Sequence, residues 1–289
     1  MNERQSNCPI DRGQRIFTCG HSFHFWVPGL LAEMARAAGI VGHQTIGTSA
    51  IGGSRAIQHW DVPEEQNKAK QALRAGTVDV LTLSCMSGPD EGIGAFAKFA
   101  VAHNPHIRIT LQELWLPEDR FPFDPLNRTR KSNQQFNDST LADLRKPHAA
   151  YFKSMEDCVR ALNRELGRQT VFIVPDAQAT LALRARIVAG TAPGIGEQAD
   201  LFADPWGHPR PPLQLLAAYC HFAVIYRRNP LGLPLPSPDV FSQSWPEKRP
   251  WRTDELNRLL QELAWDAVCQ HPLSGVRANR FAHEDERHG

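Results

Sequence analysis

Short apolar runs alternate with longer segments of helical period along most of the chain, and this alternation restricts the possible folds more than any other feature. Because the segments between the apolar runs are long enough for crossover helices, neighbouring strands should run parallel. The pattern predicts an α/β chain, a three-layer α/β/α sandwich with a five-stranded parallel sheet and right-handed crossovers. The predicted strands are Arg15–Cys19, Ile40–Ile46, Val78–Cys85, Ile107–Leu114 and Thr170–Pro175.

Helices are predicted between and after these strands, most of them closed by a Gly or Asn at or just beyond the end. The crossover helices are Leu30–Ala38, Glu64–Ala75, Ile93–His103 and Pro147–Leu166. Three more follow the last strand, at about Ala177–Ala189, Pro212–Tyr226 and Thr253–Val268. The last of these has its leucines on one face, so we expect a packing helix.

The 289 residues show no shift in composition that would divide them, so we expect one domain over residues 15–270. Tails are expected at residues 1–14 and 271–289. The polar stretch 117–146 is too long for an ordinary turn, and we expect either a substrate-shaping insertion or a surface excursion. Residues 230–270 should form a Pro-rich wrap that ends in the packing helix.

The net charge of +1 comes from scattered charges without a basic stretch, which argues against nucleic acid and against an anionic membrane surface as partners. We expect a small-molecule partner, and the oligomeric state stays open. No run of about eighteen apolar residues occurs, and the first fifteen positions are polar. The expected location is cytoplasmic for the chain as it stands, and periplasmic or secreted if a leader has been removed.

Six cysteines are widely spaced without a C-x-x-C pair, and most are expected to be buried thiols. Cys19 and Cys85 lie near the ends of predicted strands. Sites in open α/β sheets form at such ends, so these two thiols could lie near a site.

The first predicted strand leads into Gly20-His21-Ser22, which puts a serine just beyond a glycine where a strand gives way to a helix. This position exposes a hydroxyl at the carboxyl edge of the sheet, close to helix amides that can stabilise an oxyanion. The alternative interpretation is that Ser22 caps the helix.

A hydroxyl becomes a nucleophile when a base accepts its proton, and a third group holds that base in the correct tautomer. Asp204 and His208 offer both groups in one turn-forming segment before an apolar helix. The alternative is a surface loop in which the aspartate caps and the histidine is solvated.

Glycines after the second predicted strand form a third candidate element. Gly52 and Gly53 would let a backbone N–H approach a developing negative charge closely. The segment lacks the G-x-G-x-x-G spacing of a dinucleotide site, and a flexible turn is the alternative.

The order of these elements resembles the SGNH (GDSL-type) hydrolase superfamily over about residues 15–230. The family's Gly-Asp-Ser block matches Gly20-His21-Ser22, and its Asp-x-x-His block matches Asp204 and His208 with one more residue between them. Its oxyanion glycine corresponds to Gly53, with Gly52 as the close alternative. The resemblance implies a serine esterase or deacylase with a Ser-His-Asp triad, an ester substrate such as an acylated carbohydrate, and no cofactor.

The family's third block, Gly-x-Asn-Asp, has no counterpart in Leu83–Gly92, which contains no asparagine. The chain would therefore be an atypical bacterial member. Either two backbone donors suffice for the oxyanion, or another side chain serves, and Gln112 at the end of the fourth strand is the best substitute by location. A polar residue that merely ends a strand, and a non-catalytic ligand-binding member of the fold, are the alternatives.

Other polar and aromatic side chains are expected to contact a substrate near Ser22. They are His21, His24, Asp90 and Trp115. A metal-assisted hydrolase using His21, His24 and His208, with Asp90 or Glu113, is a further alternative. No H-E-x-x-H or H-x-H spacing supports it, and no metal is expected.

Overall fold

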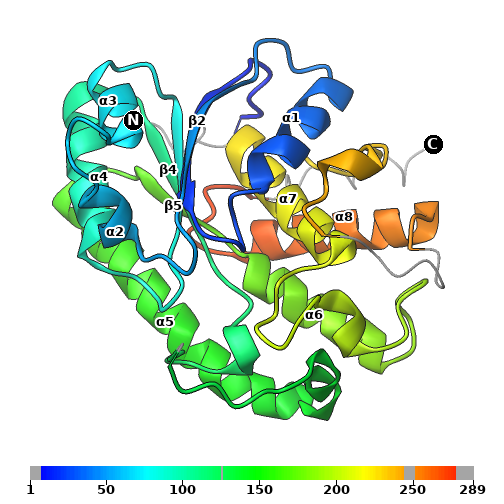
Figure 1. The fold of residues 1–289 in the computed structure, drawn as a ribbon. Coiled ribbons are helices and arrows are strands. Elements are labelled where there is room, and N and C mark those ends of the chain that lie inside the picture. Colours follow the sequence, from blue (N-terminus) through cyan, green and yellow to red (C-terminus); the bar gives the residue numbers. More distant parts are fainter. Residues whose placement is uncertain (1–7, 125, 244–250, 278–289) are drawn as a thin grey trace.

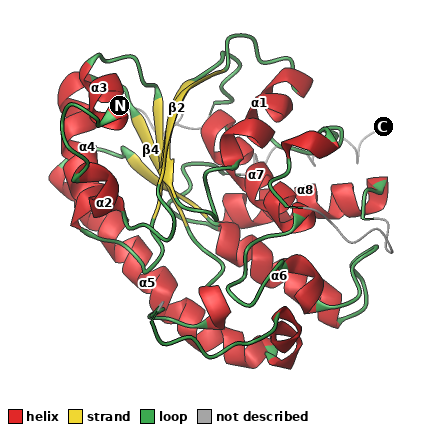
Figure 2. Cartoon of the chain, in the orientation of Figure 1, coloured by secondary structure: helices red, strands yellow, loops and turns green. Residues whose placement is uncertain are grey.

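Five parallel strands form the centre of the computed structural model, which describes residues 8–124, 126–243 and 251–277. Their order across the sheet is β2-β1-β3-β4-β5, and Figure 2 shows them between two layers of helices. The predicted three-layer α/β/α sandwich is confirmed. The strands are β1 Arg15–Gly20, β2 Gln44–Ala50, β3 Val80–Ser84, β4 Arg108–Gln112 and β5 Val171–Val174.

The helices divide between the two faces of the sheet (Figure 1). One face carries α2 Ala56–Trp60, α3 Lys68–Arg74, α4 Glu91–His103 and α5 Leu141–Glu165. The other carries α1 Val27–Ala37, α6 Asp176–Val188, α7 Pro211–Tyr226 and α8 Asp254–Gln270. Short 3-10 helices occur at Pro117–Asp119, Asn133–Asp138, Gln198–Leu201 and Pro238–Val240.

Helix α7 is buried over its whole length. It packs against α1 and α8 on one side of the sheet, which explains why its sequence is apolar all round rather than along one stripe. Among the described residues, no helix is both long and apolar enough to cross a membrane.

The second strand lies later in the chain than predicted. The expected strand Ile40–Ile46 is replaced by a turn after α1 and then by β2 at Gln44–Ala50. Because β2 is an edge strand with no fully buried residue, no apolar run marks it in the sequence.

Helix α5 begins at Leu141, inside the stretch that was expected to be irregular up to residue 146. The Thr140 side chain accepts a hydrogen bond from the Asp143 N–H, and the Asp143 carboxylate accepts one in return from the Thr140 N–H. This capping box starts the helix ahead of Pro147, the predicted first residue.

Parts of both expected tails pack against the domain. The N–H of Ile10 donates to the carbonyl of Tyr226, and the N–H of Gly13 donates to that of Val41. The N–H of Ile173 in β5 donates to the carbonyl of Leu273, beyond α8. The remaining tail positions 1–7 and 278–289, and residues 244–250 of the wrap, lie outside the described residues.

Asp176 is one of the acidic side chains buried in the domain, together with Glu113 and Glu118. Asp176 opens α6 and is fully buried, with Nε2 of His221 3.5 Å from its carboxylate. Burial raises the pKa of Asp176 well above its ordinary value, and the nearby charge of Glu113 adds to the rise. Burial also lowers the pKa of His221 to about 3, so the contact joins two groups that both favour their neutral forms.

We expect Asp176→Asn to change how stability depends on pH. A carboxyl whose pKa is raised on folding stabilises the folded state at low pH, and this contribution is lost as the pH rises through the raised pKa. The neutral amide has no such loss. The margin between the free energies of unfolding of the variant and the wild type should therefore shift in favour of the variant as the pH rises above about 4.

Denaturant titrations at about pH 4, 6 and 8 measure this margin. Parallel pH curves for the two proteins would contradict the assignment of a raised pKa to Asp176.

Candidate active site

Ser22 lies in a tight turn between the end of β1 and the start of α1. The N–H groups of His24 and Phe25 both donate to the carbonyl of His21, which folds the chain back on itself. A Cβ at Gly20 would lie 2.5 Å from the His24 ring, so this fold requires glycine there. The residue that caps α1 is Trp26 rather than Ser22, so the serine does not have the capping role.

The structure brings Ser22, His208 and Asp204 together in one hydrogen-bonded chain. Nε2 of His208 lies 2.8 Å from the Ser22 hydroxyl, and Nδ1 of His208 lies 2.6 Å from Oδ2 of Asp204. The other carboxylate oxygen, Oδ1, accepts backbone N–H groups of Trp206, Gly207 and His208 at 3.0, 3.1 and 3.2 Å. The arrangement has the connectivity of a nucleophile, a base and an orienting acid.

The carboxylate of Asp204 sets the tautomer of His208. Burial by itself would raise the pKa of Asp204, but the hydrogen bond and charge of His208 and the backbone donors outweigh it and lower the pKa below its ordinary value. The ionised carboxylate accepts, so Nδ1 of His208 must carry the ring proton. Nε2 is then free to accept the proton of the Ser22 hydroxyl.

The insertion supports the loop that carries Asp204 and His208. Phe202 forms a β-bridge to Pro209 across this loop, and the N–H of Ala203 donates to the carbonyl of His208 at 2.8 Å. Phe136, from the insertion, stacks on Phe202 with ring centroids 4.0 Å apart. Neither phenylalanine could be predicted from the sequence, because contacts between residues so far apart in the chain leave no local pattern.

Trp115 packs against residues that contact His208, and it is not on an open surface. It is buried, its ring stacks on Phe23 at 5.4 Å, and Phe23 in turn meets the His208 ring edge-on at 4.9 Å. Its indole N–H donates to the carbonyl of Gly207 at 2.9 Å. The structure thus replaces the expected substrate-binding role of Trp115 with a supporting one.

Gln112 and His24 lie beneath the Ser22 turn, and both are fully buried. The Gln112 amide donates to the carbonyl of Phe23 at 3.2 Å, and its oxygen contacts Nδ1 of His24. Nε2 of His24 lies 3.0 Å from the Thr82 hydroxyl. Burial, with a smaller effect from His221, lowers the pKa of His24 to about 3. The structure therefore places neither Gln112 at an oxyanion position nor His24 in contact with a substrate.

His21 is also buried, although it is next to the serine in sequence. Its Nδ1 accepts the N–H of Phe23 at 3.2 Å, and Nε2 lies 3.1 Å from the Ser84 hydroxyl at the end of β3. Burial lowers its pKa well below the ordinary value. Its observed role is to connect the turn to β3 rather than to bind substrate.

The Asp90 carboxylate caps the starts of two helices. Its carboxylate accepts the N–H groups of Ala56, Ile57 and Gly92 at 2.9, 3.0 and 2.8 Å. These bonds join the starts of α2 and α4, so the expected contact with substrate is replaced by a capping role.

The three histidines of the metal alternative have separate partners. His21 faces Ser84, His24 faces Thr82 and Gln112, and His208 faces Ser22. Over residues 8–124, 126–243 and 251–277, no three His, Cys, Asp or Glu side chains are placed to share a metal ion. None of the six cysteines, all of which lie in the described ranges, forms a disulfide, and burial raises the pKa of both Cys19 and Cys85.

The turn after β2 lies beside the serine turn, because the N–H of Ile51 donates to the carbonyl of Gly20 at 3.1 Å. Gly53 has a φ of 63°, in the left-handed region that glycine adopts without strain. In the part of the chain that the structure describes, the N–H groups of Ser22, Gly52 and Gly53 donate to no protein acceptor. These two neighbouring turns therefore carry three backbone donors without a protein acceptor.

The fold is similar to that of a DUF4886 family protein from Bacteroides uniformis, with a TM-score of 0.54 and 16% identity over 89% of this chain and 95% of that one. A protein from Parabacteroides merdae described as a GDSL-like lipase (TM-score 0.46, 13% identity, 74% and 96% covered) and phospholipase A1 from Streptomyces albidoflavus (0.43, 12%, 74% and 99%) are more distant. At these identities the likeness to the first shows a shared fold, and the other two scores are too low to add to it. No protein-family model and no curated protein matches the sequence.

We expect Gln112→Leu to lower the free energy of unfolding by about 1–3 kcal/mol, because it leaves the buried Phe23 carbonyl and the His24 ring without their partner. Gln134→Leu is the matched control, since Gln134 is exposed, and its effect should stay within about 0.5 kcal/mol. Urea titrations of both variants measure the difference. An unchanged midpoint in Gln112→Leu would show that this amide is not part of a buried network.

Proposed function

We propose that this chain is a serine-dependent hydrolase that cleaves carboxylic esters through an acyl-enzyme. The observation that carries the proposal is the hydrogen-bonded chain from Ser22 through His208 to Asp204. The α/β/α sandwich supports it, because Ser22 follows the carboxyl end of the first strand, as the resemblance to SGNH-type hydrolases implies.

In the first half of the reaction, the Ser22 oxygen attacks the ester carbonyl carbon and His208 Nε2 takes the hydroxyl proton. The bond between this carbon and the alkoxy oxygen then breaks, and the alcohol leaves with the proton from His208. In the second half, water attacks the acyl-enzyme and His208 takes one of its protons. The acid is released, and the proton returns to Ser22.

Asp204 stabilises the imidazolium that forms on His208 in both halves. Its lowered pKa keeps it ionised, and the three backbone donors on Oδ1 fix the carboxylate in place. It stays a carboxylate throughout and orients the base.

The tetrahedral intermediate carries a negative charge on one oxygen, and we assign its donors to the backbone N–H groups of Ser22 and Gly53. Gly52 is the close alternative. Both glycines lie on the exposed turn after β2, and their N–H groups have no partner in the described ranges. With Gln112 buried beneath the turn, the site uses backbone donors in place of the missing asparagine.

We expect Ser22→Ala and His208→Ala to lower kcat on a short-chain aryl ester by about a millionfold, and Asp204→Asn by about ten-thousandfold. The first two remove the nucleophile and the base, whereas the third only weakens the orientation of the base. The thermal midpoints should stay close to that of the wild type, because Ser22 and His208 are partly exposed. Steady-state kinetics with and without a chelator measure these effects.

Ser154→Ala and His103→Ala are the controls, since both residues lie on helices away from the serine turn, in α5 and α4. Their kinetic constants should match the wild type. Turnover by Ser22→Ala at the wild-type rate would refute the covalent mechanism, and loss of turnover with chelator would favour a metal-assisted one. A folded wild type that binds esters without hydrolysing them would be a non-catalytic member of the fold.

A further inference from the structure

A second histidine, His59 in α2, bridges two serine hydroxyls on the other side of the glycine turn. The ring is 1% exposed, with Nδ1 2.7 Å from the Ser49 oxygen and Nε2 2.7 Å from the Ser54 oxygen. Burial lowers its pKa to about 4, so the ring is neutral at physiological pH. A neutral imidazole has one donor and one acceptor, and both are used here.

The two serines flank the turn that carries the candidate oxyanion donors. Ser49 lies in β2, one residue before the strand ends, and Ser54 follows Gly53 directly. One rigid ring therefore ties together both ends of the segment that contains Gly52 and Gly53. We call Ser49, His59 and Ser54 the His59 clamp.

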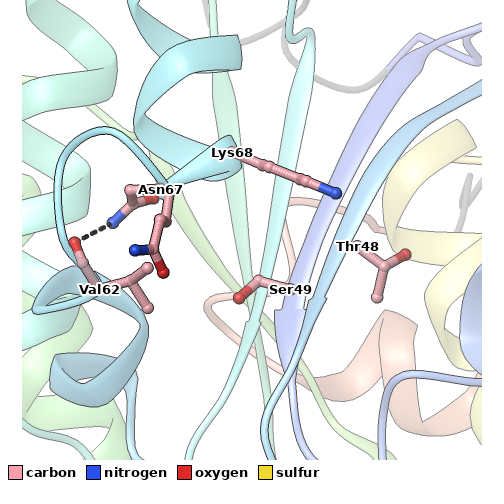
Figure 3. Close-up of a pocket in the computed structure, with 6 residues that line it drawn as sticks. Thr48, Ser49, Val62, Asn67 and Lys68 are labelled. Carbon is pink, nitrogen blue, oxygen red and sulfur yellow. Dashed lines mark hydrogen bonds between the residues drawn. The ribbon is translucent and has the colours of Figure 1, made fainter.

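The backbone of His59 is fixed by Asn67, at the start of α3. The Asn67 amide donates to the carbonyls of His59, Trp60 and Val62 at 2.9, 3.2 and 3.3 Å, and Figure 3 shows the last of these bonds. At the start of α2, the Asp90 carboxylate accepts the first two N–H groups of the helix. The helix that carries the ring is therefore held by Asn67 and Asp90, which both lie outside the segment 49–54.

The two hydroxyls of the clamp differ in their access to water. Ser49 is partly exposed and lines a cavity of about 70 Å³, so water can replace its bond to the ring. Ser54 is fully buried, and its hydroxyl would be left without a partner if the ring could not bond. Figure 3 shows Ser49 and Asn67 on this cavity. Its other lining residues are Thr48, Val62, Gln66 and Lys68.

We propose that His59 is a positioning residue for the oxyanion site: through Ser54 it holds the Gly52–Gly53 turn where a backbone N–H can reach the oxyanion on Ser22. The proposal rests on the proposed ester hydrolysis. It assigns a function to a histidine that touches neither Ser22 nor His208. A displacement of about 1 Å in a reacting site can cost about a hundredfold in rate, so a modest shift of this turn would be measurable.

The kinetic test compares His59→Phe, which keeps a ring but cannot hydrogen-bond, with His148→Phe. His148 is an equally buried histidine in α5, bonded to the Leu144 carbonyl. We expect His59→Phe to lower kcat about tenfold to a hundredfold with KM nearly unchanged, because the turn acts on the transition state. His59→Gln, which can still bond one hydroxyl, should recover part of the loss, and His148→Phe should leave both constants unchanged.

Serine variants test the route through Ser54. Ser54→Ala should lower kcat. In the double variant with His59→Phe, the fold-loss in kcat should be smaller than the product of the two single losses, because both changes break the same bond. Ser49→Ala should have the smaller effect, since β2 is also held by its pairing with β1. Independent, multiplicative effects of His59→Phe and Ser54→Ala would overturn the proposed route.

Hydrogen exchange tests the clamp without relying on turnover. The Met86 N–H donates to the Ser54 carbonyl at 3.0 Å, so its exchange reports on the position of the turn. Exchange at Met86 should accelerate in His59→Phe and in Ser54→Ala, and not in His148→Phe.

The two readouts separate this proposal from the proposed function. A wild type without esterase activity would refute the proposed function, and exchange alone would then decide whether the clamp holds the turn. Unchanged exchange and unchanged kcat in a folded His59→Phe or Ser54→Ala variant would overturn the clamp. If His59→Phe does not fold, Ser54→Ala and His59→Gln provide the same comparisons.

Discussion

The bond between the Ser22 hydroxyl and Nε2 of His208 joins two segments that are 186 positions apart, and the candidate site depends on it. Ser22 and His208 are held in position in different ways. Ser22 is carried by the end of a central strand, whose register with two neighbours fixes it. His208 lies on a loop, and loops need extra contacts to hold a side chain within a few tenths of an ångström.

Those extra contacts come from the insertion and from the core. Arg184 in α6 is fully buried and makes two bonds to the Asp119 carboxylate, at 2.6 and 3.1 Å, which ties the insertion to the domain. The insertion then packs Phe136 on Phe202, at the base of the His208 loop. A buried charged pair costs desolvation, and removing either partner would leave an unpaired charge, so this ion pair fixes position more than it adds stability.

The strands that are buried on both faces could be predicted from the sequence, because such strands are continuous apolar runs. The edge strand β2 has no such run, and its predicted position, Ile40–Ile46, was too early in the chain. Ser22, Asp204 and His208 were predicted as candidates from short motifs, and the structure joins them in one hydrogen-bonded chain. Gln112 and Trp115 were assigned to the wrong surroundings, because a position at a strand end does not show which way the side chain points. No sequence pattern indicated His59, because its hydrogen bonds to Ser49 and Ser54 form only in the folded chain.

The central claim is that Ser22 is a nucleophile activated by His208, and covalent labelling tests it most directly. After treatment with a fluorophosphonate, peptide mapping by mass spectrometry should find one adduct, on Ser22, and the rate of its formation should fall sharply in His208→Ala. No adduct on the folded protein, or an adduct on another residue with Ser22 unmodified, would contradict the account.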